Sequence, residues 1–135
     1  MTFYTPLEVV SKSLIPGIKR MIALSLMEKG LTEFEIASIL GLTQPSVSRY
    51  KHRKRGAFGD LSQHPEILEK VNTLSELIAQ RKLPVYRILH EIDRIALYAL
   101  SQGYACNICK SVNGEPFLAC DHVCVTKSIT LNPTL

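Results

Sequence analysis

The sequence predicts an all-α protein, and three observations support this fold class. Apolar residues recur at intervals of three and four in several separate stretches, which is the spacing of one helix face. Glycine or proline stands between these stretches, where helices begin and end. No βαβ pattern is present. The chain has 135 residues, 46% of them apolar and 21% charged, which is enough for one soluble globular domain or two small ones.

The first helix is expected to run from Pro16 to about Lys29, after a short lead over residues 1–12. The tripeptide Ile15-Pro16-Gly17 interrupts the chain, and proline suits the first turn of a helix because its missing N–H has no partner there. Apolar residues are nearly continuous through this helix, as expected of a helix at the centre of a small domain. Gly30 is expected to end it.

The stretch from residue 32 to 50 predicts two short helices joined by a tight turn. Thr32 and Glu35 have the spacing of a capping box at the start of the first helix. Gly41 can adopt the positive φ that ends this helix without a Cβ penalty. Thr43 is the expected N-cap of the second helix.

The packing positions of the same stretch indicate how the two helices cross. Ala37 is small enough for a close crossing, Leu42 can fill the corner, and Val47 and Tyr50 would face inward. This combination is typical of a helix-turn-helix, whose second helix lies in the major groove of DNA. The side chains left on the outward face are Gln44, Pro45, Ser46, Ser48 and Arg49.

Basic residues crowd together at the end of this stretch, and no acidic residue lies among them: Arg49, Lys51, Arg53, Lys54 and Arg55. An ordinary solvated face usually mixes both signs, whereas a basic run beside a recognition helix suits phosphate neutralisation. We therefore expect double-stranded DNA as the partner. The residues expected at base edges are Gln44, Ser48 and Arg49. The residues expected at phosphates are Ser46, Lys51, Arg53, Lys54 and Arg55.

Two further amphipathic helices are expected, from about Glu66 to Lys82 and from about Val85 to Gln102. Their apolar stripes can pack on the core of the same chain or form the interface of a homodimer. The dimer is favoured because a single helix-turn-helix contacts too few base pairs. We therefore divide the chain into a DNA-binding domain at 1–58, a helical dimerisation region at 59–103 and a cysteine-rich tail at 104–135.

The tail contains all four cysteines, in the pattern C-x2-C-x10-C-x3-C: Cys106, Cys109, Cys120 and Cys124. The dipeptide Asn113-Gly114 predicts a two-residue turn that would bring the two pairs together. Four thiolates are a full ligand set for an iron–sulfur cluster or for zinc, and two disulfides or free thiols are the remaining options. The cluster is preferred because the pairs are unequal and because a regulator without a small-molecule domain needs an input. Tyr104 and Phe117 are candidates to shield it.

Several classes of protein are disfavoured. No signal peptide is visible and the longest apolar stretch, at residues 21–27, is too short to cross a bilayer, so we expect a cytoplasmic protein without a membrane partner. No catalytic triad, phosphate loop or carboxylate pair indicates an enzyme or a small-molecule substrate. A redox enzyme using Cys106 and Cys109 is disfavoured because no βαβ pattern surrounds them.

The run Gly41-Leu42-Thr43-Gln44-Pro45-Ser46-Val47-Ser48-Arg49-Tyr50, with Arg53-Lys54-Arg55-Gly56 after it, resembles a group of archaeal transcriptional regulators. Their DNA-binding domain is similar to that of the phage-repressor-like family. The resemblance covers residues 7–56, and members also tend to carry a cysteine-rich tail. It implies an all-α DNA-binding domain, dimerisation and a role in transcription. We therefore expect a dimeric, sequence-specific regulator with a redox-sensing iron–sulfur cluster. The alternative is a constitutive repressor or antitoxin with structural zinc.

Overall fold

The computed structural model describes residues 2–52, 61–121 and 124, and within these ranges it is all-helical. The expected all-α fold class is therefore confirmed. The elements in chain order are α1 (Pro6–Val9), a π-helical turn η1 (Val10–Leu14), α2 (Ile15–Glu28), α3 (Glu33–Leu40), α4 (Gln44–His52), α5 (Pro65–Ala79), α6 (Val85–Ser101), α7 (Cys106–Asn113) and a 3-10 turn η2 (Glu115–Phe117).

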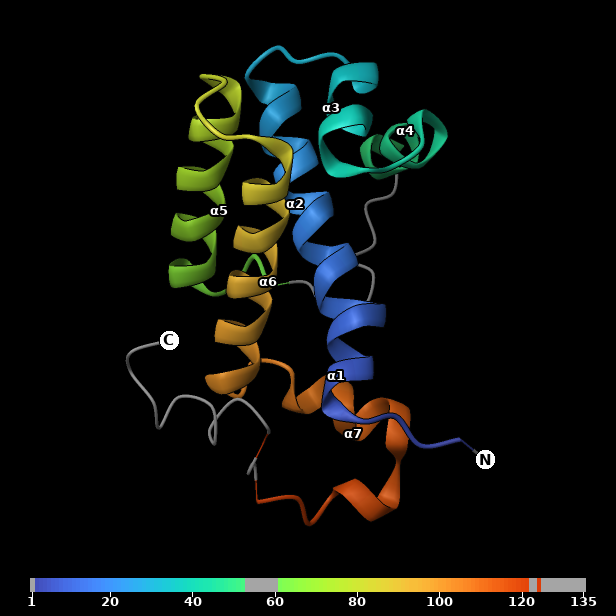
Figure 1. Cartoon of the computed structure of the whole chain (residues 1–135). Coiled ribbons are helices and arrows are strands. Elements are labelled where there is room, and N and C mark those ends of the chain that lie inside the picture. The colour runs from blue at the N-terminus through green and yellow to red at the C-terminus, as the bar shows by residue number, and fades with distance from the viewer. Residues whose placement is uncertain (1, 53–60, 122–123, 125–135) are drawn as a thin grey trace.

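Helices α2, α5 and α6 lie side by side and form a bundle (Figure 1), and each of them contacts the other two. The α3–α4 pair, residues 33–52, lies at one end of the bundle, and α7 lies at the other end. One continuous cluster of buried apolar side chains joins α2, α3 and α4 to α5 and α6. The DNA-reading and cysteine-containing segments predicted from the sequence thus lie at opposite ends of one core.

The N-terminal segment is an unbroken helical run from Pro6 to Glu28, so the expected lead over residues 1–12 with a break before Pro16 is wrong. In η1 the Ile15 N–H donates to the carbonyl of Val10, five residues earlier. A proline ring inside an α-helix crowds the carbonyl four residues before it and removes one hydrogen bond. The wider π turn just before Pro16 relieves this conflict, so the helix continues through the proline.

The apolar stripes of α5 and α6 are buried within the chain. Their buried members are Ile67, Val71, Leu74 and Ile78 in α5, and Ile88, Ile92, Ile95, Ala96, Ala99 and Leu100 in α6. These side chains belong to the same cluster as the buried residues of α2. The stripes therefore supply the core of this chain, and a dimer, which remains a prediction, needs a different surface.

The Asn113-Gly114 dipeptide ends α7 and does not form the expected two-residue turn between cysteine pairs. Gly114 follows the helix with φ of 76°, a conformation suited to glycine. The Asn113 side chain is 2% exposed and is bonded at both ends to Tyr4: Oδ1 accepts from the Tyr4 N–H at 2.6 Å, and Nδ2 donates to the Tyr4 carbonyl at 3.1 Å. An asparagine before a glycine is equally compatible with a helix C-terminus, which is why the sequence alone was misleading here.

Among the described residues, none of the helices combines the length and the apolar character needed to cross a bilayer.

Candidate functional site

The start of α3 and the turn from α3 into α4 are each fixed by local hydrogen bonds. The Thr32 Oγ1 accepts from the Glu35 N–H at 3.1 Å, and the Glu35 carboxylate accepts from the Thr32 N–H at 3.0 Å. Gly41 adopts φ of 66° at the end of α3, and the next N–H, of Leu42, donates to the Ala37 carbonyl at 2.9 Å. The chain therefore leaves α3 sharply and enters α4 after three residues.

The inner face of α4 is held by a cap and a buried valine. The Thr43 Oγ1 accepts from the Ser46 N–H at 3.2 Å, as expected of an N-cap. Val47 is fully buried, and Tyr50 packs half-buried against the same core. Burial raises the pKa of Tyr50, and the nearby Arg49 charge lowers it by a smaller amount. These contacts set the rotation of α4 and therefore determine which side chains face outward.

The outward face of α4 carries the residues expected to contact bases. Gln44, Pro45 and Arg49 are exposed, and Ser46 and Ser48 are partly exposed. Lys51 is also exposed, at the C-terminal end of α4. The other three members of the basic run lie outside the described residues: Arg53, Lys54 and Arg55.

Ser46 has a bond that the sequence analysis did not foresee. Its Oγ accepts from Nη2 of Arg49 at 3.2 Å and lies 2.8 Å from the Thr43 Oγ1. Thr43, just before α4, and Ser46 and Arg49 within it are spaced by three, so each is a neighbour of the next on the helix surface. Ser46 therefore orients the Arg49 guanidinium, in addition to any contact that it makes with a phosphate. The i, i+3 spacing is the signal from which this could have been found.

The α3–α4 pair is tied to the bundle by an ion pair between Glu35 and Arg81 at 2.5 Å. Arg81 lies between α5 and α6 in a left-handed conformation, with φ of 58°. The pKa of Glu35 is lowered, first by its hydrogen bonds to the Thr32 backbone and then by the Arg81 side chain. Glu35 thus has a second role beside the capping box, and no local sequence pattern indicates a partner 46 positions away.

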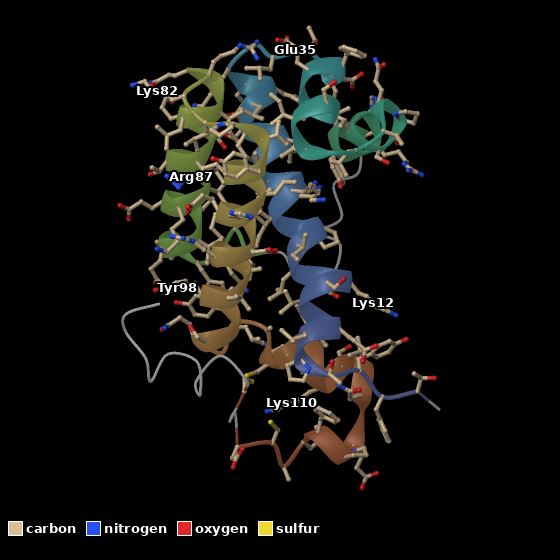
Figure 2. The ribbon with its side chains drawn as sticks, in the orientation of Figure 1. Lys12, Glu35, Lys82, Arg87, Tyr98 and Lys110 are labelled. Atoms are coloured by element: carbon tan, nitrogen blue, oxygen red, sulfur yellow. The ribbon has the colours of Figure 1, made fainter. Side chains whose placement is uncertain are left out.

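The four cysteines line one cavity of about 90 Å³ at the opposite end of the molecule. Cys106 and Cys109 lie one turn apart at the start of α7, and Cys120 and Cys124 follow η2. The other lining residues are Pro6, Leu100, Lys110 and Phe117. In Figure 2, Lys110 marks this end of the molecule, and Glu35 marks the other. We name this feature the cysteine cavity.

The spacing between the thiols bears on what the cysteine cavity can hold. In the described part of the chain, no three Cys, His, Asp or Glu side chains are placed to hold a single metal ion. A tetrahedral zinc site with Zn–S bonds of about 2.3 Å needs its sulfurs roughly 3.8 Å apart. Four thiolates are a full ligand set for a zinc ion or for an iron–sulfur cluster. Burial raises the pKa of Cys109, and the neighbouring Cys124, Cys106 and Cys120 raise it further.

Phe117 lines the cysteine cavity as expected, whereas Tyr104 has different contacts. The Tyr104 ring stacks on His64 with centroids 3.7 Å apart, and its hydroxyl donates to the Glu66 carboxylate. That hydrogen bond is the main cause that raises the pKa of Tyr104 to about 12. Tyr104 thus fastens the link between α6 and α7 to the start of α5.

Two surfaces of this chain therefore carry chemistry: the outward face of α4 and the cysteine cavity. Fold alone does not specify function, so the residues at these two places must support any assignment. Comparison with protein-family models, with curated proteins and with solved structures finds no match to this chain.

Proposed function

We propose that this protein is a sequence-specific, dimeric DNA-binding regulator of transcription whose α3–α4 pair acts as a helix-turn-helix. The observation that best supports the proposal is the fixed rotation of α4. With Val47 buried and Thr43 capping the helix, Gln44 is exposed at the start of α4 and Arg49 is exposed on the side away from Val47. A short helix with such a face fits the major groove, where side chains can reach base edges.

The outward residues then have distinct roles. Gln44 suits bidentate pairing with adenine and Arg49 suits guanine, each worth about 1–3 kcal/mol of discrimination. Ser48 adds a further base contact, and Ser46 orients Arg49. Lys51 contacts phosphate, together with the basic residues that follow it in the sequence: Arg53, Lys54 and Arg55.

The proposal is tested by selecting a preferred duplex from a random library and measuring binding of two variants by fluorescence anisotropy. Arg49→Ala should weaken binding to the selected duplex by about 1–3 kcal/mol and relax the preferred sequence. The matched control is Lys51→Ala, which should weaken binding to all duplexes alike and reduce the salt slope by about one. Equal, sequence-independent losses in both variants would contradict the role of Arg49. Absence of binding to any duplex at low salt would contradict the function itself.

We further propose that the cysteine cavity holds an iron–sulfur cluster that makes DNA binding respond to redox state. The support is that all four cysteines line one cavity, and four thiolates are the full ligand set of such a cluster. Protein purified without oxygen should be brown and contain iron and sulfide, and Cys109→Ser should lose the colour. A colourless protein containing stoichiometric zinc would favour the alternative, a constitutive repressor or antitoxin with a structural metal.

One observation bears on the redox-enzyme alternative. Cys106 and Cys109 open α7, and a helix N-terminus is where reactive Cys-x-x-Cys pairs usually lie. Metal coordination, however, uses four thiolates, and all four cysteines line the cysteine cavity together. We therefore favour metal binding over thiol–disulfide exchange. An insulin-reduction assay separates the two, and measurable turnover would reverse this preference.

A further inference from the structure

One face of α6 is left uncovered by the rest of the described chain. Ile88, Ile92 and Ile95 point into the core, and on the opposite side exposed residues recur at intervals of four, three and four. These exposed residues are Tyr86, His90, Asp93 and Leu97. Tyr86 is 64% exposed and Leu97 is 36% exposed. We name these four residues the outer stripe of α6.

The outer stripe is complementary to itself under a two-fold axis. If two copies of α6 pack antiparallel, with the axis midway between Glu91 and Ile92, Tyr86 of one copy lies opposite Leu97 of the other. His90 then lies opposite Asp93, so an imidazole N–H can donate to a carboxylate. Each contact occurs twice, as a closed symmetric interface requires. A parallel pair would instead place Asp93 against Asp93, which is unfavourable.

The side chains of the stripe are already arranged on one surface. The Tyr86 and His90 rings meet edge to face with centroids 5.9 Å apart, so the aromatic and polar parts of the stripe are adjacent. Two more exposed apolar residues, Val85 and Leu89, lie next to Tyr86 in the same helix. The stripe therefore offers an apolar contact at each end and a polar contact near its centre.

The same two-fold axis also determines how far apart the α3–α4 pairs of the two copies lie. The α3–α4 pair lies beside the N-terminal end of α6, on the side away from α5 (Figure 1). A two-fold axis perpendicular to α6 therefore puts the two units near opposite ends of the antiparallel helix pair. A helix of 17 residues is about 25 Å long, which is of the order of the roughly 34 Å between successive major grooves on one face of DNA.

We propose that two copies of this chain dimerise through the outer stripe of α6, in an antiparallel pair with its axis between Glu91 and Ile92. The use of this dimer rests on the proposed DNA-binding function, but its existence does not. The occupant of the stripe is a second copy because the His90 donor and the Asp93 acceptor, and the apolar residues Tyr86 and Leu97, match under this one operation.

A charge exchange tests the pairing in the full-length protein, by sedimentation velocity over a concentration series without DNA. Asp93→Lys places a lysine opposite His90, and His90→Asp places two acids opposite each other. Each should weaken the dimer at least tenfold. The double variant restores an acid opposite a base and should return the dissociation constant to within about threefold of the wild type. Glu69→Lys, at an exposed site on α5, is the control for charge alone and should change little.

The outcomes separate this inference from the proposed function. A monomeric wild type, or a dimer that is indifferent to both single changes, would overturn the α6 pairing whether or not DNA is bound. A dimer that follows the charge exchange yet binds no duplex would support the pairing and contradict the DNA-binding function. Thermal unfolding followed by circular dichroism verifies that each variant is folded.

Discussion

Ser46 and Arg49 illustrate how a side chain can be prepared for binding before its partner arrives. Arg49 is exposed, and a long exposed side chain ordinarily loses rotamer freedom when it docks. The Ser46 hydroxyl already restricts the Arg49 guanidinium, with Thr43 bonded to that hydroxyl in turn. If α4 binds DNA as proposed, part of the ordering cost is already met in the folded protein, which would raise specific affinity.

Replacing Ser46 with alanine should lower affinity for the preferred duplex by about 0.5–1.5 kcal/mol, the typical value of one hydrogen bond. Binding to unrelated duplexes should change much less, because Arg49 can still approach a phosphate. Fluorescence anisotropy with both duplexes measures the difference. Ser38→Ala on α3 is the matched control, since the Ser38 hydroxyl bonds the Phe34 carbonyl of its own helix. Equal loss on both duplexes would instead indicate that Ser46 contacts phosphate directly.

At the scale of the elements, the ion pair between Glu35 and Arg81 joins the α3–α4 pair to the turn between α5 and α6. The pKa of Glu35 lies below its ordinary value of 4.5, chiefly because of the Thr32 backbone N–H and then because of Arg81. A lowered folded-state pKa means that the stabilisation is present above about pH 4.5. It is lost as the pH falls through the lower, folded-state value.

Glu35→Gln should therefore be less stable than the wild type at pH 7, with the difference disappearing on acidification below pH 4.5. Glutamine retains the capping box but removes the charge that Arg81 pairs with. Urea unfolding at several pH values measures the effect, and Arg81→Ala completes a double-mutant cycle. A stability difference that persisted unchanged below the pKa of Glu35 would show that the ion pair is not its source.

The sequence predicted the elements whose signals are local. The Thr32–Glu35 capping box, the left-handed Gly41 and the buried Val47 are all present, because each depends on residues within one or two turns. Two expectations failed where the outcome depends on distant packing: Pro16 lies within a helical run, and Asn113 is buried against Tyr4. Periodicity identifies the apolar face of a helix but does not say whether that face is covered by the same chain. Here the apolar stripes of α5 and α6 are buried within the core of the same chain.

The same limit applies to the candidate sites. The outward residues of α4 follow directly from helix periodicity, and the cysteine spacing indicated a shared site. The contribution of Pro6 and Leu100 to the cysteine cavity, and the reach of Arg81 to Glu35, depend on how whole helices pack, which no short pattern encodes.

At the scale of the whole molecule, the N-terminal segment meets α7 and η2 at the cysteine cavity. Asn113 holds the Tyr4 backbone through two hydrogen bonds, and Phe3 lies against Phe117 with ring centroids 6.3 Å apart. Pro6, two residues after Tyr4, forms part of the cavity wall. The start of the long helical run is therefore part of the cysteine site.

Asn113→Ala should remove both bonds to Tyr4 and destabilise the protein by about 1–3 kcal/mol, because two partly buried backbone groups would lose their partners. Hydrogen exchange at the N-terminal residues should accelerate, and bound metal should be lost faster to a chelator. Asn107→Ala, at an exposed position of the same helix, is the matched control and should leave both rates unchanged. Unchanged hydrogen exchange of the Tyr4 N–H in Asn113→Ala would show that the two hydrogen bonds from Asn113 do not hold the N-terminus in solution.

The helical run from Pro6 to Glu28 begins at α7 and contacts α3 and α4 farther along (Figure 1). An α-helix is stiff along its axis and turns by about 100° for each residue. Such a helix can transmit a rotation about its axis as well as a displacement along it. The π turn η1 contains one more residue than an α-helical turn. Moving or removing this extra residue would rotate α2, and the α3–α4 pair with it, relative to the cysteine cavity.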